Sequence, residues 1–152
     1  MSLNFDKYAV KGNEFVKLVA DELNVPMEKA GRVIRAVLHA LRNRVSHEES
    51  FQLMAQLPMC IKGVYVDGWK FDKVYNRITH LNDFFDEARK EDGDIAGYDF
   101  GNNKKAEIAI ASVFKALKYF ISDGEMNDVI GVLPAEIGHF IKKSIAGNEL
   151  VI

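Results

Sequence analysis

The chain has 152 residues, of which 48% are hydrophobic and 28% are charged, and its formal net charge is -2. This length and apolar content allow a proper core, so we expect a folded chain rather than a disordered one. The charge gives no general attraction to nucleic acid or to an anionic membrane, and no apolar run approaches the ~20 residues that span a bilayer. The single cysteine, Cys60, excludes an intramolecular disulfide and a cysteine metal cluster. Since the N-terminus also lacks the pattern of a signal peptide, we expect a cytoplasmic protein that does not enter membranes.

The second half of the chain repeats the pattern of the first half. Residues 34–61 align with residues 110–137 at a constant shift and without gaps. The identical pairs are Ile34/Ile110, Val37/Val113, Ala40/Ala116, Leu41/Leu117, Ser46/Ser122, Glu49/Glu125, Leu57/Leu133, Pro58/Pro134 and Ile61/Ile137. Ordinary residue usage would give about two identities, so the pattern indicates duplication of one structural unit.

The first two elements of the unit are predicted from apolar spacing. Residues 4–23 follow the helical period, with Gly12 expected to bend or interrupt the helix. The helix should end before Pro26, which suits the first turn of a second helix. The second helix carries one apolar stripe, formed by Ile34, Val37, Leu38, Leu41 and Val45. Its opposite side carries a basic stripe of four residues, Arg32, Arg35, His39 and Arg42.

The next elements are marked by a cap and a proline. Ser46 and Glu49 predict a capping box, in which the hydroxyl accepts from the Glu49 amide and the carboxylate reaches back to the Ser46 amide. The second copy has the same residue types at the aligned positions. Pro58, repeated as Pro134, removes a helical hydrogen bond, so each copy should break there and continue as another helix.

These elements define two units and a link. We expect a first helical repeat at residues 4–70, a link at 71–79 and a second helical repeat at 80–147. Within the second repeat we expect helices at 81–91, 104–120 and 123–145, a flexible polar loop at 92–103, and beyond it an apolar tail at 150–152 that docks on the body or on a second chain. Each unit alone has too small a core, so the predicted fold is all-α: two tandem repeats of a three- to four-helix unit, packed as one pseudo-two-fold helical bundle and one compact domain.

The most specific segment of the chain runs from Ala55 to Trp69. It contains Leu57-Pro58, then Ile61-Lys62-Gly63-Val64-Tyr65, then Asp67-Gly68-Trp69. This segment, with the residues before it, resembles the bacterial domain of unknown function 2267 family, over about Phe5 to Lys143. Members of that family are small, prokaryotic and helical, with no assigned activity. The resemblance therefore implies a helical fold and carries no catalytic residue over to this chain.

The sequence offers weak candidates for metal binding. Glu136 and His139 have the i, i+3 spacing of di-iron bundles, but the aligned positions of the first copy are Cys60 and Gly63, which supply no second pair. His80 would contribute only if the fold brought it close. Asp92, Asp94 and Gly97 resemble the start of a calcium loop, whose closing glutamate is replaced by Asn103. We therefore expect no metal, and the chain contains no motif for a cofactor or a catalytic nucleophile.

Two groups of residues remain as candidates for binding. The basic stripe of Arg32, Arg35, His39 and Arg42 could bind an anionic partner if it is exposed and free of acidic partners. Tyr65 and Trp69 could contact a protein partner, or Trp69 could seal the junction between the halves.

We interpret the chain as a non-catalytic binding or interaction domain, with a homodimer as an open possibility. One alternative is the binding of a polyanion through Arg32, Arg35 and Arg42, although the net charge does not favour nucleic acid as a partner. The other alternative is a small-molecule or metal-dependent enzyme with a site between the repeats.

Overall fold

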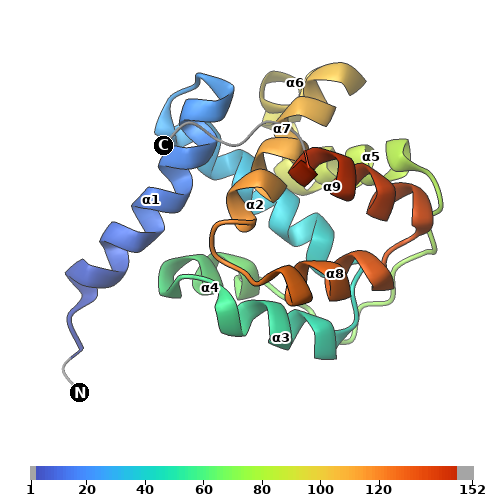
Figure 1. Ribbon diagram of the computed structural model, residues 1–152. Coiled ribbons are helices and arrows are strands. Elements are labelled where there is room, and N and C mark those ends of the chain that lie inside the picture. The colour runs from blue at the N-terminus through green and yellow to red at the C-terminus, as the bar shows by residue number, and fades with distance from the viewer. Residues whose placement is uncertain (1–2, 147–152) are drawn as a thin grey trace.

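The structure, a computed structural model, describes residues 3–146, and every regular element in that range is a helix (Figure 1). The helices are α1 (Phe5–Leu23), α2 (Met27–Arg42), α3 (His47–Gln56), α4 (Met59–Val66), α5 (Leu81–Asp92), the 3-10 turn η1 (Gly93–Ile95), α6 (Ala96–Asp99), α7 (Asn103–Leu117), α8 (Asp123–Val132) and α9 (Ala135–Ala146). The apolar tail at 150–152 and the last residue of the predicted second repeat lie outside the described residues. No helix of the described range is long and apolar enough to cross a membrane.

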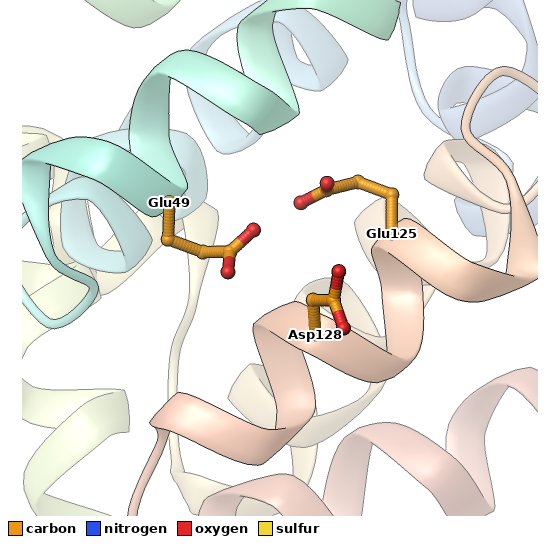
Figure 2. A group of neighbouring side chains, drawn as sticks. All are labelled: Glu49, Glu125 and Asp128. Carbon is orange, nitrogen blue, oxygen red and sulfur yellow. The ribbon is translucent and has the colours of Figure 1, made fainter.

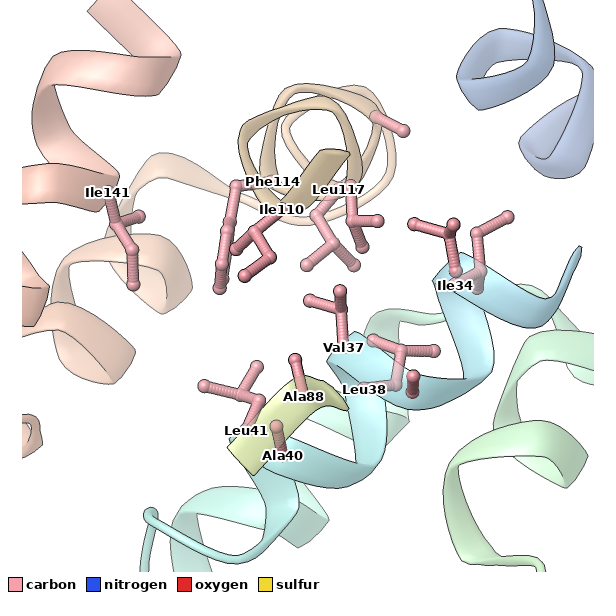
Figure 3. Close-up of a cluster of buried hydrophobic side chains, with 14 of the residues drawn as sticks. Ile34, Val37, Leu38, Ala40, Leu41, Ala88, Ile110, Phe114, Leu117 and Ile141 are labelled. Atoms are coloured by element: carbon pink, nitrogen blue, oxygen red, sulfur yellow. The ribbon is translucent and has the colours of Figure 1, made fainter. Parts of the chain in front are cut away.

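Helix α2 forms the centre of an all-α bundle. It packs against α1, α4, α5 and α7, so it contacts helices from both halves of the chain. Its apolar stripe, including Val37 and Leu41, is buried and faces Ile110, Phe114 and Leu117 of α7 (Figure 3). The two stripes predicted from the sequence therefore meet in one core.

Corresponding helices in the two halves begin at positions that are separated by the same number of residues as the aligned positions of the sequence. Paired helices begin at Phe5 and Leu81, Met27 and Asn103, His47 and Asp123, and Met59 and Ala135, each pair separated by the shift that relates Ile34 to Ile110. The predicted breaks at the prolines are confirmed: α3 ends before Leu57 and α4 begins after Pro58, while α8 and α9 flank Pro134. Leu57 and Leu133 adopt extended backbone, as expected for residues that precede proline.

The expected interruption at Gly12 is wrong. Helix α1 runs unbroken through this residue, which is buried. A Cβ atom at Gly12 would lie 2.9 Å from the Cβ atom of Cys60 in α4. The glycine therefore permits the close approach of α1 to α4.

Only one of the two hydrogen bonds of each predicted capping box forms at α3 and α8. The Ser46 and Ser122 hydroxyls accept hydrogen bonds at 3.1 Å from the backbone amides of Glu49 and Glu125. The Ser122 amide, however, donates to Gln56 Oε1 at 2.6 Å. The two glutamate side chains do not return to the serines, and their Oε2 atoms are buried without a hydrogen-bond partner.

The expected flexible loop at 92–103 is also wrong over most of its length. Residues 93–99 fold into η1, which packs on α5, and into α6, which packs on α5 and α2. Asp99 is buried and accepts two hydrogen bonds from Arg32, at 2.9 and 3.0 Å. Lys29 donates to the Tyr98 carbonyl at 3.1 Å and lies over the Tyr98 ring. These contacts with α2 help to give this segment its structure.

Candidate functional site

The basic stripe of α2 is already occupied by contacts within the chain. Arg32 pairs with Asp99, and Arg35 Nη2 donates to Asp67 at 2.9 Å. His39 is 2% exposed, and its Nε2 donates to the Val64 carbonyl at 2.7 Å. The Arg42 side chain is also buried. The stripe is therefore not the exposed, unpaired row that polyanion binding would require.

Two of these basic residues hold the C-terminal end of α4. Arg42 Nη1 donates to the carbonyls of Tyr65 and Asp67, at 2.7 and 2.9 Å, beside the bond from His39 to Val64. The last carbonyls of a helix lack partners within the helix and carry partial negative charge, so cationic and N–H donor groups suit them. Burial lowers the pKa of His39, while the hydrogen bond from Arg35 lowers the pKa of Asp67.

Arg42 also lines a basic pocket of about 700 Å³. Its walls come from the turn between α2 and α3, from the link after α4, and from the turn between α8 and α9. Six of the lining residues are basic: Arg42, Arg44, His47, Lys70, Lys73 and Arg77. No acidic residue is among the described residues that line it, although the chain as a whole has more acids than bases.

The basic groups of this pocket differ in how they are held. Arg44 forms an ion pair with Glu87, and Arg42 keeps a buried Nε without a hydrogen-bond partner. Lys73 Nζ lies 4.9 Å from the centre of the Tyr75 ring, so its charge faces an aromatic surface. For Lys70, Lys73 and Arg77, the part of the chain that the structure describes supplies no acidic partner within 4.0 Å. Their positive charge is available to a ligand.

The two aromatic candidates have different positions. Tyr65 is fully buried, shares a 2.7 Å hydrogen bond with Ser50, and has its pKa raised to about 12 by burial. Trp69 is half-buried and lines the basic pocket, where its ring centre lies 4.4 Å from that of Phe71 and 5.7 Å from the Arg42 guanidinium. Trp69 is thus placed to meet a ligand, whereas Tyr65 belongs to the core.

One group of three neighbouring carboxylates was not predicted from the sequence. Glu49 of α3 faces Glu125 and Asp128 of α8, and one oxygen from each lies within 4.8 Å of the others (Figure 2). Burial, followed by the nearby Glu49 carboxylate, raises the pKa of Glu125 to about 8. The alignment contained a signal for this group, because Glu49 and Glu125 are an identical pair.

The other metal candidates play structural parts. Glu136 Oε1 accepts from the Leu81 amide at 3.0 Å, and Glu136 Oε2 lies 3.3 Å from His80 Nδ1, so this carboxylate caps α5. His139 is exposed, and Cys60 is an exposed free thiol beside Gly12. Asp92 ends α5 and Gly97 lies in α6, so the calcium-loop residues are distributed over helical turns.

The fold and its pocket define an all-α bundle with a basic hollow between segments from both halves of the chain. Residues 12–140 match the family model DUF2267, described as an uncharacterized conserved protein. The chain therefore belongs to the DUF2267 family, as its sequence suggested. A comparison with curated proteins gives no match.

Proposed function

We propose that this protein is a non-catalytic binding module whose basic pocket takes a small anionic ligand, one that carries phosphate or carboxylate groups. The observation that carries the proposal is the convergence of six basic side chains, without an acid, on one pocket of a chain with negative net charge. The volume falls in the range of small-ligand sites, which is roughly 300–1,000 Å³.

The chemistry of the lining favours recognition. Guanidinium and ammonium groups stay protonated at neutral pH, so they attract and orient an anion rather than exchange protons with it. Arg42 and Arg44 are held by the carbonyls of α4 and by Glu87, which fixes the inner wall. Lys73 and Arg77 at the exposed link supply charge that can move to meet the ligand.

The polyanion alternative receives less support. Nucleic acid bound along α2 would have to draw Arg32 from Asp99 and Arg35 from Asp67. A small anion in the pocket leaves both pairs intact. The pocket also lies between segments of the two halves, so a ligand bound there would contact both of them.

Isothermal titration with inorganic pyrophosphate tests the proposal. We expect saturable binding that weakens between about 50 and about 300 mM salt, because the contacts are partly exposed ion pairs. The double variant Lys73→Glu/Arg77→Glu should weaken binding at least about tenfold. The matched control Lys7→Glu/Lys104→Glu makes the same change of net charge at exposed positions outside the pocket, so it should bind as wild type. Equal affinity in both variants would overturn the proposal.

We also propose that residues 4–70 and 80–147 are diverged copies of one unit, related by a rough two-fold axis and folding together as one domain. The common shift of the helix starts supports the duplication. The contacts of α2 with α5 and α7 support joint folding.

Self-association is a second candidate function, supported by an aromatic patch beside the pocket. Phe51 and Phe71 are 54% and 53% exposed and lie next to Trp69. Exposed aromatic side chains of this kind anchor protein interfaces. Sedimentation of wild type and of Phe51→Ser/Phe71→Ser would test for a homodimer: a dimer lost in the variant supports it, and a wild-type monomer at all concentrations rejects it.

A further inference from the structure

The contact between α3 and α8 places two acidic side chains face to face. Glu49 and Glu125 each lie in the first turn of their helix, and the two helices run side by side (Figures 1 and 2). The residues are only 8% and 6% exposed. Asp128, one turn further along α8, is exposed and gives the group an open side.

The buried oxygens of this group have no partner. Glu49 Oε2 and Glu125 Oε2 are buried without a hydrogen bond, and Figure 2 shows both carboxylates directed into the space between the helices. The predicted capping boxes would have used these carboxylates, but the Ser122 amide is satisfied by Gln56 instead. Both side chains are thus free of the capping role and point to a common position.

The group also lacks a positive counter-charge. Among the described residues, no Lys, Arg or His forms an ion pair with Glu49, Glu125 or Asp128. Tyr65 of α4 lies near the group and is neutral at neutral pH, since its ordinary pKa of 10.0 is raised further by burial. Two adjacent buried carboxylates stay ionised together only when a cation lies between them; without it, one of the two holds a proton.

We propose that Glu49, Glu125 and Asp128 form a binding site for one hard divalent cation, of the class of Ca²⁺, Mg²⁺ or Mn²⁺, which joins α3 to α8. Carboxylate oxygens are the ligands that these ions prefer, at about 2.0–2.6 Å, so donors up to about 4.8 Å apart can share one ion. The spacing of the three oxygens, within 4.8 Å, meets this limit. Water entering beside Asp128 would complete the coordination sphere.

Cation binding at this position is linked to pH and to folding. Carboxyl groups must lose their protons to bind a cation, so apparent affinity should rise with pH. Because the ligands come from helices in different halves of the chain, binding also opposes unfolding.

The test uses the full chain, stripped with EDTA and dialysed at neutral pH. Titration with Ca²⁺, Mg²⁺ or Mn²⁺ alone should give saturable binding and raise Tm for at least one ion. Affinity should fall at least about tenfold at pH about 4, where carboxyl groups take up protons that compete with the ion. Direct equilibrium dialysis of the wild type measures binding even if a variant fails to fold.

Two variants separate this site from general effects of charge. Glu125→Gln keeps the shape of the side chain but removes one ligand charge, so binding should weaken at least about tenfold. Glu48→Gln makes the same change at an exposed position in the same turn of α3, and binding should be unchanged. No saturable binding of any of the three ions at neutral pH, or equal binding by Glu125→Gln and wild type, would overturn the proposal, whatever the result with pyrophosphate.

Discussion

His39 illustrates how burial changes what a basic residue does. It belongs by sequence to a row of cations, yet its ring lies in the core and donates to the end of α4. The Arg42 and Arg35 charges add to burial in lowering its pKa, while Glu91 acts in the opposite direction. His39 thus fixes α4 as a neutral donor and has no role in the proposed binding of an anion.

This role predicts a pH dependence of stability. The folded-state pKa of His39 lies below the ordinary value of 6.5, so only the unfolded chain takes up this proton just below pH 6.5. The free energy of unfolding should therefore decrease as the pH falls through this range. His39→Gln keeps an N–H donor for Val64 and should remove this part of the decrease in urea titrations. His139→Gln, at an exposed position, serves as control; a pH profile of His39→Gln equal to wild type would contradict the assignment.

Glu125 predicts a pH dependence of the opposite sign. Its pKa is raised from 4.5 to about 8, so the folded, cation-free protein retains a proton that the unfolded chain releases. Its contribution to stability is fully present below pH 4.5 and is lost as the pH rises to about 8. Glu125→Gln should flatten this loss when unfolding is followed in EDTA. A loss that persists unchanged in the variant would assign it to other groups.

At the scale of the helices, part of the structure followed from local rules and part did not. The serine caps and the proline breaks depend on residues within one turn, so they were predicted for both copies. The roles of Gly12 and of residues 93–99 depend on partners far along the chain, Cys60 and Arg32. A sequence pattern read one helix at a time contains no signal for such contacts.

Two glycines provide a matched test of helix packing. Gly12→Ala in α1 brings a Cβ atom within 2.9 Å of Cys60 Cβ, so overpacking should lower the free energy of unfolding by about 1–3 kcal/mol. Gly31→Ala in α2 meets no atom within 4 Å, so the same substitution should raise it by about 0.5–1 kcal/mol. Urea denaturation followed by circular dichroism measures both. Stabilisation by Gly12→Ala would show that α1 can move away from α4 at little cost.

For the whole molecule, the decisive feature is the contact of both halves in one core. The apolar stripes of α2 and α7 were visible in the sequence, and they do face each other (Figure 3). The basic pocket was not predicted, because its lining residues come from Arg42 to Ala135 and meet only in the folded bundle. In the sequence, the acidic group could be recognised only as an aligned pair of glutamates, and nothing indicated that the two side chains would lie close together.

The shared core predicts cooperative unfolding. Leu41 and Leu117 are aligned and both buried, and their helices pack against each other. Leu41→Ala and Leu117→Ala should each lower the free energy of unfolding by about 2–5 kcal/mol, within a single transition. Scanning calorimetry and circular dichroism would check that the transitions coincide. A two-step transition in either variant would show that the halves fold independently.

The position of Trp69 has a practical consequence. The chain contains one tryptophan, and that indole lines the basic pocket with the Arg42 guanidinium over its ring. Its fluorescence therefore comes from a single known place in the molecule. An anion that enters the pocket changes the polarity around the indole, so the emission maximum and quenching by iodide would report occupancy without any attached label.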